Sequence, residues 1–195
     1  MKTKLIILGF VVIIGGLGLW VTKNQTASVV STSDWKTYTT PNKLFSFDYP
    51  PTWFMSAVVR EKFGGQDDLT WYVSNLKELP LPTTASFVLK DGQIMISFNT
   101  SGTNQKSTWV LDDFLKGCSS KEYLECKKVT INGIEFVRSV FLQNSKTQKA
   151  TATILTALVN GGMYSFGGYT LIGPDESKQI AEMDKVFNTI KINSR

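Results

Sequence analysis

Apolar and polar residues alternate with a period of two along several segments of the chain. The clearest segment is 44–49, in which three aromatic residues alternate with Ser46 and Asp48. Successive side chains of a strand point to opposite faces, so this period predicts strands with one buried face. The segments that show the alternation or are rich in strand-forming residues are 44–49, 94–98, 134–140, 151–159 and 163–172.

Three Asn-Gly or Asp-Gly pairs separate these segments. Such pairs tolerate the positive φ angles that a tight hairpin turn requires. The pairs are Asp91-Gly92, between Ser86–Lys90 and Gln93–Phe98; Asn132-Gly133, between Lys127–Ile131 and Ile134–Leu142; and Asn160-Gly161, between Thr151–Val159 and Gly162–Ile172. They predict three hairpins and therefore an antiparallel sheet.

Two segments instead show the spacing of a helix with one apolar face. Residues 108–116 have apolar side chains at spacings of three and four, and Gly117 follows as a predicted C-terminal cap. Residues 174–189 form the second predicted helix, with Pro174 at the first helical position and two acidic residues next to it. Strands with separate helices indicate an α+β fold, an antiparallel sheet with several hairpins covered by helices.

An uncharged apolar segment, LIILGFVVIIGGLGLWV, occupies residues 5–21. As a helix it would be roughly 26 Å long, between a signal-peptide core and a full membrane span. Trp20 at its outer end and the lack of a good A-x-A cleavage site after it favour a retained transmembrane anchor. Lys2 and Lys4 precede it, which predicts a cytoplasmic N-terminus and an extracytoplasmic domain. The alternatives are a cleaved signal peptide, which would give a secreted protein, and a buried core helix.

The chain thus divides into a membrane segment (1–22), a polar spacer rich in Ser and Thr (23–34) and one domain (35–195). Its 21 Lys and Arg against 16 Asp and Glu give a net charge of +5. Two of the positive charges precede the apolar segment, so the exported part is only mildly basic. This charge is too small to indicate a nucleic-acid partner.

Export gives the two cysteines a structural meaning. Outside the cytoplasm a pair of cysteines most simply forms a disulfide. A continuous helix over residues 118–126 would separate the two Cα atoms by about 12 Å, whereas a disulfide needs them within about 7 Å. A Cys118–Cys126 bond therefore requires a turn, which we place at Ser119-Ser120. The alternative is two free buried thiols.

The chain contains no histidine. This excludes Ser-His-Asp and Cys-His catalysis and zinc sites that need imidazole. Three adjacent acidic pairs are present, but neighbouring residues do not share a strand face, so structural roles are favoured over metal binding or acid–base catalysis. The pairs are Asp67-Asp68, Asp112-Asp113 and Asp175-Glu176. We therefore predict no catalytic residues, no metal site and no cofactor.

Two further features are candidates for binding. Gly167-Gly168 lies inside a strand pattern and predicts a bulge or a close backbone approach, where a ligand could also lie. Residues 63–82 are the least regular part of the domain, and loops on a rigid sheet commonly carry binding function. The candidate recognition surface consists of Trp71, Tyr72, Asp67 and Asp68, although Trp71 also suits the core.

The opening of the domain resembles a known family. Trp35-Lys36-Thr37-Tyr38 is followed by an aromatic strand that ends in Tyr49-Pro50, with Trp53 shortly afterwards. This order resembles the start of PsbP-like domains, and residues 183–191 are similar to that superfamily's last helix and final short strand. The resemblance implies an antiparallel sheet sandwiched by helices in a membrane-anchored or secreted bacterial relative. It also implies a binding or accessory role rather than catalysis. Proline ends the strand here, so Trp53 can fold back over the sheet, as a core residue or as a ligand contact.

Three functions follow as hypotheses. The first is a membrane-anchored, extracytoplasmic binding or accessory domain of the cell envelope without catalysis, whose specific partner, an envelope protein or a small ligand, is left open. The second is an envelope hydrolase that uses carboxylates or a serine without histidine. The third is a carrier of a small ligand, which predicts an apolar cavity between sheet and helix.

Overall fold

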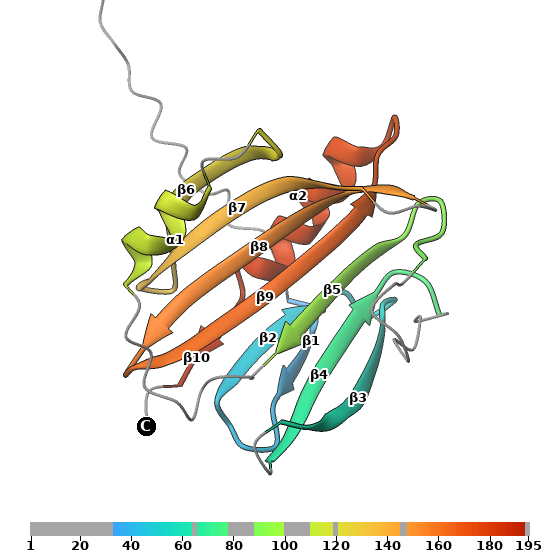
Figure 1. Cartoon of the computed structure of the whole chain (residues 1–195). Coiled ribbons are helices and arrows are strands. Elements are labelled where there is room, and N and C mark those ends of the chain that lie inside the picture. The colour runs from blue at the N-terminus through green and yellow to red at the C-terminus, as the bar shows by residue number, and fades with distance from the viewer. Residues whose placement is uncertain are drawn as a thin grey trace, which may run out of the picture. The chain divides into compact units, whose positions relative to one another are not determined.

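Two antiparallel sheets and two helices form the described part of the chain (Figure 1). The computed structural model describes residues 33–63, 66–77, 88–99, 110–118, 121–144 and 148–193.

The larger, seven-stranded sheet has the order β3-β4-β5-β9-β8-β7-β6. Its strands are β3 (Phe54–Phe63), β4 (Gln66–Ser74), β5 (Ile94–Asn99), β6 (Tyr123–Ile131), β7 (Ile134–Asn144), β8 (Lys149–Val159) and β9 (Gly162–Leu171). The smaller sheet has the order β1-β2-β10, with β1 (Lys36–Thr39), β2 (Phe45–Tyr49) and β10 (Lys191–Ile192). The predicted α+β class, antiparallel sheets with helices, is confirmed.

Two of the three predicted hairpins are confirmed. Asn132 and Gly133 join β6 to β7 with φ angles of 48° and 80°, and Asn160 and Gly161 join β8 to β9 with 52° and 80°. Positive φ at both central residues is the geometry for which Asn-Gly is selected.

The prediction of a third hairpin, at Asp91-Gly92, is wrong for the residues that the structure describes, because the turn forms but no strand precedes it. Gly92 does have a positive φ of 73°, and the N–H of Gln93 donates to the carbonyl of Lys90 at 3.0 Å, so a tight turn is present. Residues 88–90 are not a strand, however, and residues 86 and 87 lie outside the described part. β5 already pairs with β4 on one side and with β9 on the other, so it has no free edge with which residues 88–90 could pair as a hairpin strand.

The helices are α1 (Leu111–Gly117) and α2 (Glu176–Phe187), both shorter than predicted. Residues 108 and 109 lie outside the described part, and Gly117 is the last residue of α1, so the cap is Cys118. Pro174 does not begin α2. The N–H of Glu176 donates to Gly173 at 3.1 Å, and Asp175 has φ −95° and ψ 3°, so Pro174 takes the second position of a type I turn that leads into the helix.

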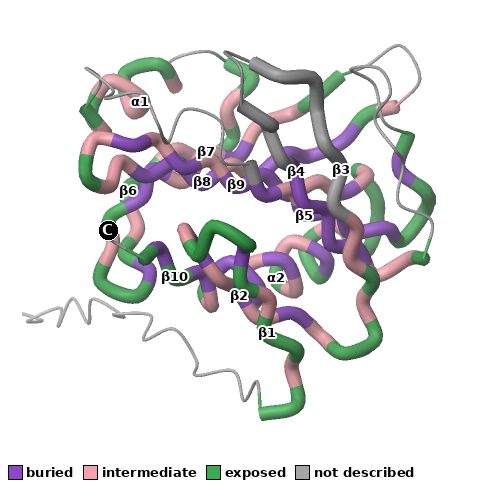
Figure 2. Tube along the Cα trace, turned by 90° about the horizontal axis from the view of Figure 1, so that it is seen from below, coloured by how far each residue is buried: buried purple, intermediate pink, exposed green. Residues whose placement is uncertain are grey.

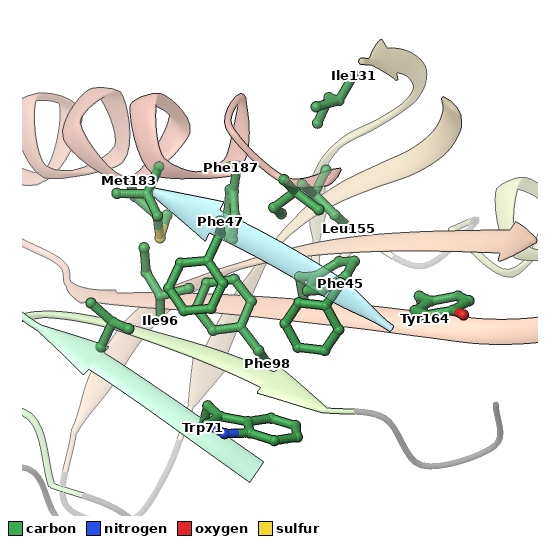
Figure 3. Close-up of a cluster of buried hydrophobic side chains, with 14 of the residues drawn as sticks. Phe45, Phe47, Trp71, Ile96, Phe98, Ile131, Leu155, Tyr164, Met183 and Phe187 are labelled. Atoms are coloured by element: carbon green, nitrogen blue, oxygen red, sulfur yellow. The ribbon is translucent and has the colours of Figure 1, made fainter. Parts of the chain in front are cut away.

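One face of the large sheet carries the core. Figure 2 shows α2 and the small sheet on this side of the large sheet and α1 on the other. Phe45 and Phe47 of β2 are buried against the large sheet, where the rings of Phe47 and Phe98 stack with centroids 3.8 Å apart. Figure 3 shows these rings gathered between α2 and the strands. Trp53 is partly buried and packs against the same cluster, so it has the core role that was one of its two predicted roles.

The last residues of the domain close the small sheet. β2 lies between β1 and β10, and the N–H of Asn193 donates to the carbonyl of Leu44 at 2.8 Å. The hydroxyl of Thr189 accepts a hydrogen bond from the N–H of Asp48 at 2.8 Å. The strand that opens the core is therefore completed by residues about 140 positions later.

Gly167-Gly168 is a place of close approach, as one reading of the sequence predicts. β8 and β9 pair there without a bulge. A Cβ on Gly168 would overlap the Sδ of Met183 and lie 3.0 Å from the Cζ of Phe187, so α2 lies directly on this strand. Residues 5–21 fall outside the described part, and no helix within that part has the length and apolarity of a membrane span.

Candidate functional site

The aromatic residues of the predicted recognition surface are inside the protein. The side chain of Trp71 is 1% exposed and makes an edge contact with Phe45, with ring centroids 5.6 Å apart. Tyr72 is buried on the opposite face of β4, in a second cluster with Met95. The side chains of Asp67 and Asp68 lie outside the described part. Neither ring is available to a partner at the surface.

The acidic pair in α1 has a structural role. The carboxylate of Asp113 accepts a hydrogen bond from the N–H of Val110 at 3.1 Å, at the start of the helix. Asp112 forms an ion pair with Lys128 of β6 at 3.0 Å, and the hydrogen bond from Lys128 lowers the pKa of Asp112. These two carboxylates cap α1 and attach it to the sheet.

In the acidic pair at α2, Glu176 also has a structural role. The carboxylate of Glu176 accepts a hydrogen bond from the hydroxyl of Thr151 in β8. In the part of the chain that the structure describes, no group of three His, Cys, Asp or Glu residues could hold a metal ion. One residue of each pair, Asp112 in α1 and Glu176 in α2, therefore attaches its helix to a strand, on different faces of the large sheet.

A disulfide joins Cys118 to Cys126, with Cα atoms 6.2 Å apart. The predicted bond is confirmed, and Ser119-Ser120, where a turn was placed, lies outside the described residues. The bond joins the end of α1 to β6, the strand at one edge of the large sheet. Together with the ion pair between Asp112 and Lys128, it gives α1 two attachments to this strand.

A group of ion pairs attaches the other side of β6. Arg138 of β7 contacts Glu125 of β6 and donates to both carboxylate oxygens of Asp184 in α2, at 3.1 and 3.2 Å. Lys127 adds a second ion pair to Glu125 at 3.1 Å. This charged cluster therefore joins the edge of the sheet to α2.

The two carboxyl groups of the charged cluster respond differently to their surroundings. Burial raises the pKa of Asp184, and the charge of Arg138 only partly opposes this rise. Burial also acts to raise the pKa of Glu125, but the hydrogen bond from Lys127 and the charge of Arg138 outweigh it, so this pKa is lowered. The sequence contained one sign of this cluster. Arg138 is a charged residue on the face of β7 where its neighbours at a spacing of two, Phe136 and Val140, are apolar and buried.

Among the described residues, the outward side of β6 combines an exposed apolar residue with charges of both signs. Within the described residues β6 pairs with β7 alone, so it forms an edge of the large sheet. Leu124 of β6 is 58% exposed here. We define the β6 edge surface as Leu124, Glu125, Lys127, Lys128 and Glu135. Charges of both signs on an edge strand discourage unspecific strand pairing, and together with an exposed leucine they offer contacts to a polar partner.

No family model matches the chain, and no curated protein matches it. A crystal structure at 1.50 Å of a protein from Bacteroides thetaiotaomicron VPI-5482 aligns over 82% of this chain, with a TM-score of 0.50 and 17% identity. This chain spans about half, 49%, of that protein. The solution structure of cyanobacterial PsbP (CyanoP) from Synechocystis sp. PCC 6803 aligns over 82% of this chain and 92% of its own, with a TM-score of 0.42 and 13% identity. The structures found thus include a PsbP protein, as the sequence resemblance predicts, and the likeness concerns the fold alone.

Proposed function

We propose that the chain is a membrane-anchored, extracytoplasmic domain that binds an envelope protein and does not catalyse a reaction. The disulfide between Cys118 and Cys126 is the observation that carries this proposal. Such bonds persist in oxidising compartments and are rare in the cytosol of ordinary cells. The bond fits a domain that folds after export.

The N-terminal sequence supports the same location. Residues 5–21 serve as the anchor, with Lys2 and Lys4 on the cytoplasmic side. If the segment is cleaved instead, the domain is secreted, and its fold and disulfide are compatible with both outcomes.

The use of the described carboxylates supports binding rather than hydrolysis. Asp112 and Glu176 attach α1 and α2 to strands, and the chain has no histidine to act as a base. A small-ligand carrier would need a cavity between sheet and helix, but at Gly168 this space is filled by Met183 and Phe187. Among the described residues, the β6 edge surface is where we expect a partner to bind.

Topology and contact can be tested separately. Protease added to intact spheroplasts should digest the domain of the full-length protein, and protection of the domain would refute an extracytoplasmic location. A photoreactive amino acid at Leu124 should then give a reproducible cross-linked protein in native membranes. The matched control is Phe54, which is 40% exposed on β3 at the opposite edge of the sheet. Equal labelling from both positions, or none from Leu124, would refute the β6 edge surface as the contact.

A further inference from the structure

Three buried side-chain oxygens between α2 and the large sheet have no hydrogen-bond partner. They are the hydroxyls of Thr153 and Thr170 and the amide oxygen of Gln179. The two threonines are fully buried, and Gln179 is 9% exposed. Buried polar groups are nearly always paired with protein or with ordered water, so three unpaired oxygens in one layer require an explanation.

The strand register places both hydroxyls on the α2 side of the sheet. Thr153 lies directly opposite Gly168, and residues opposite each other in a ladder share a face. Gly168 faces Met183 of α2, so Thr153 faces α2 as well. Thr170 follows Gly168 by two residues on the same strand and therefore points to the same side.

The helix places Gln179 on its buried, sheet-facing side. Gln179 precedes Met183 by four residues, and residues at this spacing lie on one face of a helix. Gln179 also follows Glu176 by three residues. Glu176 accepts a hydrogen bond from Thr151, and Thr151 lies opposite Thr170 in the pairing of β8 with β9. Gln179 therefore lies on the sheet side of α2, between Glu176, which is hydrogen-bonded to Thr151, and Met183, which packs on Gly168.

The chemistry of the three groups suits water. An amide oxygen only accepts, whereas a threonine hydroxyl both donates and accepts, so a water molecule can donate to Gln179 and bond to both hydroxyls. Buried water typically makes about three hydrogen bonds to groups of this kind. An apolar occupant would leave all three groups unpaired. We propose that ordered water binds between α2 and strands β8 and β9, held by Thr153, Thr170 and Gln179.

A crystal structure of the full-length protein in detergent, at a resolution that shows ordered water, is the direct test. It should show a water oxygen within about 2.7–3.2 Å of at least two of the three oxygens. Direct hydrogen bonds among the three side chains with no water between them would overturn the proposal. So would a cation, recognised by several oxygen contacts of about 2.1–2.6 Å.

Substitution of Thr153 gives opposite results for a hydrated and a dry site. If water is bound, Thr153→Val removes a satisfied hydroxyl, and we expect the melting temperature to fall by about 2–4 °C. If the site is dry, the same change removes an unpaired buried hydroxyl and should raise the melting temperature, which would overturn the proposal. Thr151→Val, which breaks the bond to Glu176, is the control that must lower it in either case. If Thr153→Val fails to fold, Thr153→Ser keeps the hydroxyl, and its crystal structure should still show the water.

Discussion

The contact between α2 and β9 gives the sharpest prediction about stability. In Gly168→Ala the added methyl group would overlap the Sδ of Met183, and it would lie 2.9 Å from the Cγ of Met183 and 3.0 Å from the Cζ of Phe187. Met183 is 0% exposed and Phe187 is 1% exposed, so neither side chain can turn out to solvent. Overpacking of this kind typically costs about 1–3 kcal/mol, and we expect the free energy of unfolding to fall by that amount.

Equilibrium unfolding in urea, followed by tryptophan fluorescence, measures this change. Gly117→Ala is the matched control, because nothing lies within 4 Å of the added Cβ and its φ is ordinary. Met183→Ala alone should cost about 2–5 kcal/mol through the cavity it opens. In the double variant the new methyl group occupies part of that cavity, so the combined loss should be smaller than the sum. A Gly168→Ala protein as stable as Gly117→Ala, or losses that simply add, would refute the close packing of α2 on β9.

Three other measurements follow from the structure. Cys118→Ser should lower the free energy of unfolding by about 2.5 kcal/mol, which is the chain-entropy value for a nine-residue loop. Reduction of the wild-type protein should raise its mass by about 2 Da, and an unchanged mass would contradict the disulfide. Glu125→Gln should cost about 0–1 kcal/mol at neutral pH, because the pKa of this half-buried carboxyl is lowered in the folded state. The difference in stability from wild type should vanish as the pH falls through that lowered pKa, and a difference that grows in acid would contradict the assignment. Asn132→Gly keeps the positive φ of the turn but removes the hydrogen bond that the side chain donates to the carbonyl of Ile190 at 2.7 Å, so it should cost about 1 kcal/mol, whereas Asn132→Ala should cost more in the same urea assay.

Local patterns predicted the fold where a short segment determines its own conformation. The alternation in 45–49, the two Asn-Gly turns and the apolar face of α2 all became the expected elements. The turn at Asp91-Gly92 shows the limit of such patterns. Its φ angle followed from the sequence, but the absence of a strand at 88–90 depends on which partners β5 takes elsewhere in the chain.

The candidate site was less predictable, because exposure is decided by distant contacts. Trp71 and Tyr72 lie next to each other on β4, and each is buried by a different set of residues from other strands. The charged cluster joins β6, β7 and α2, and only Arg138 in an otherwise apolar row gave a local sign of it. The unpaired oxygens beneath α2 follow from the register of β8 and β9 together with the position of the helix, neither of which a single segment determines.

The pairing of β2 with β10 also constrains when the protein can fold. Phe45 and Phe47 belong to a strand whose second partner, β10, begins only at Lys191. Contacts between such distant parts of a chain form late, because the long loop between them must first be closed. During synthesis β2 stays without this partner until Lys191 has been added, about 140 residues after β2. If the chain crosses a membrane as it is made, as we propose, most of the domain would therefore reach the far side before its core could close.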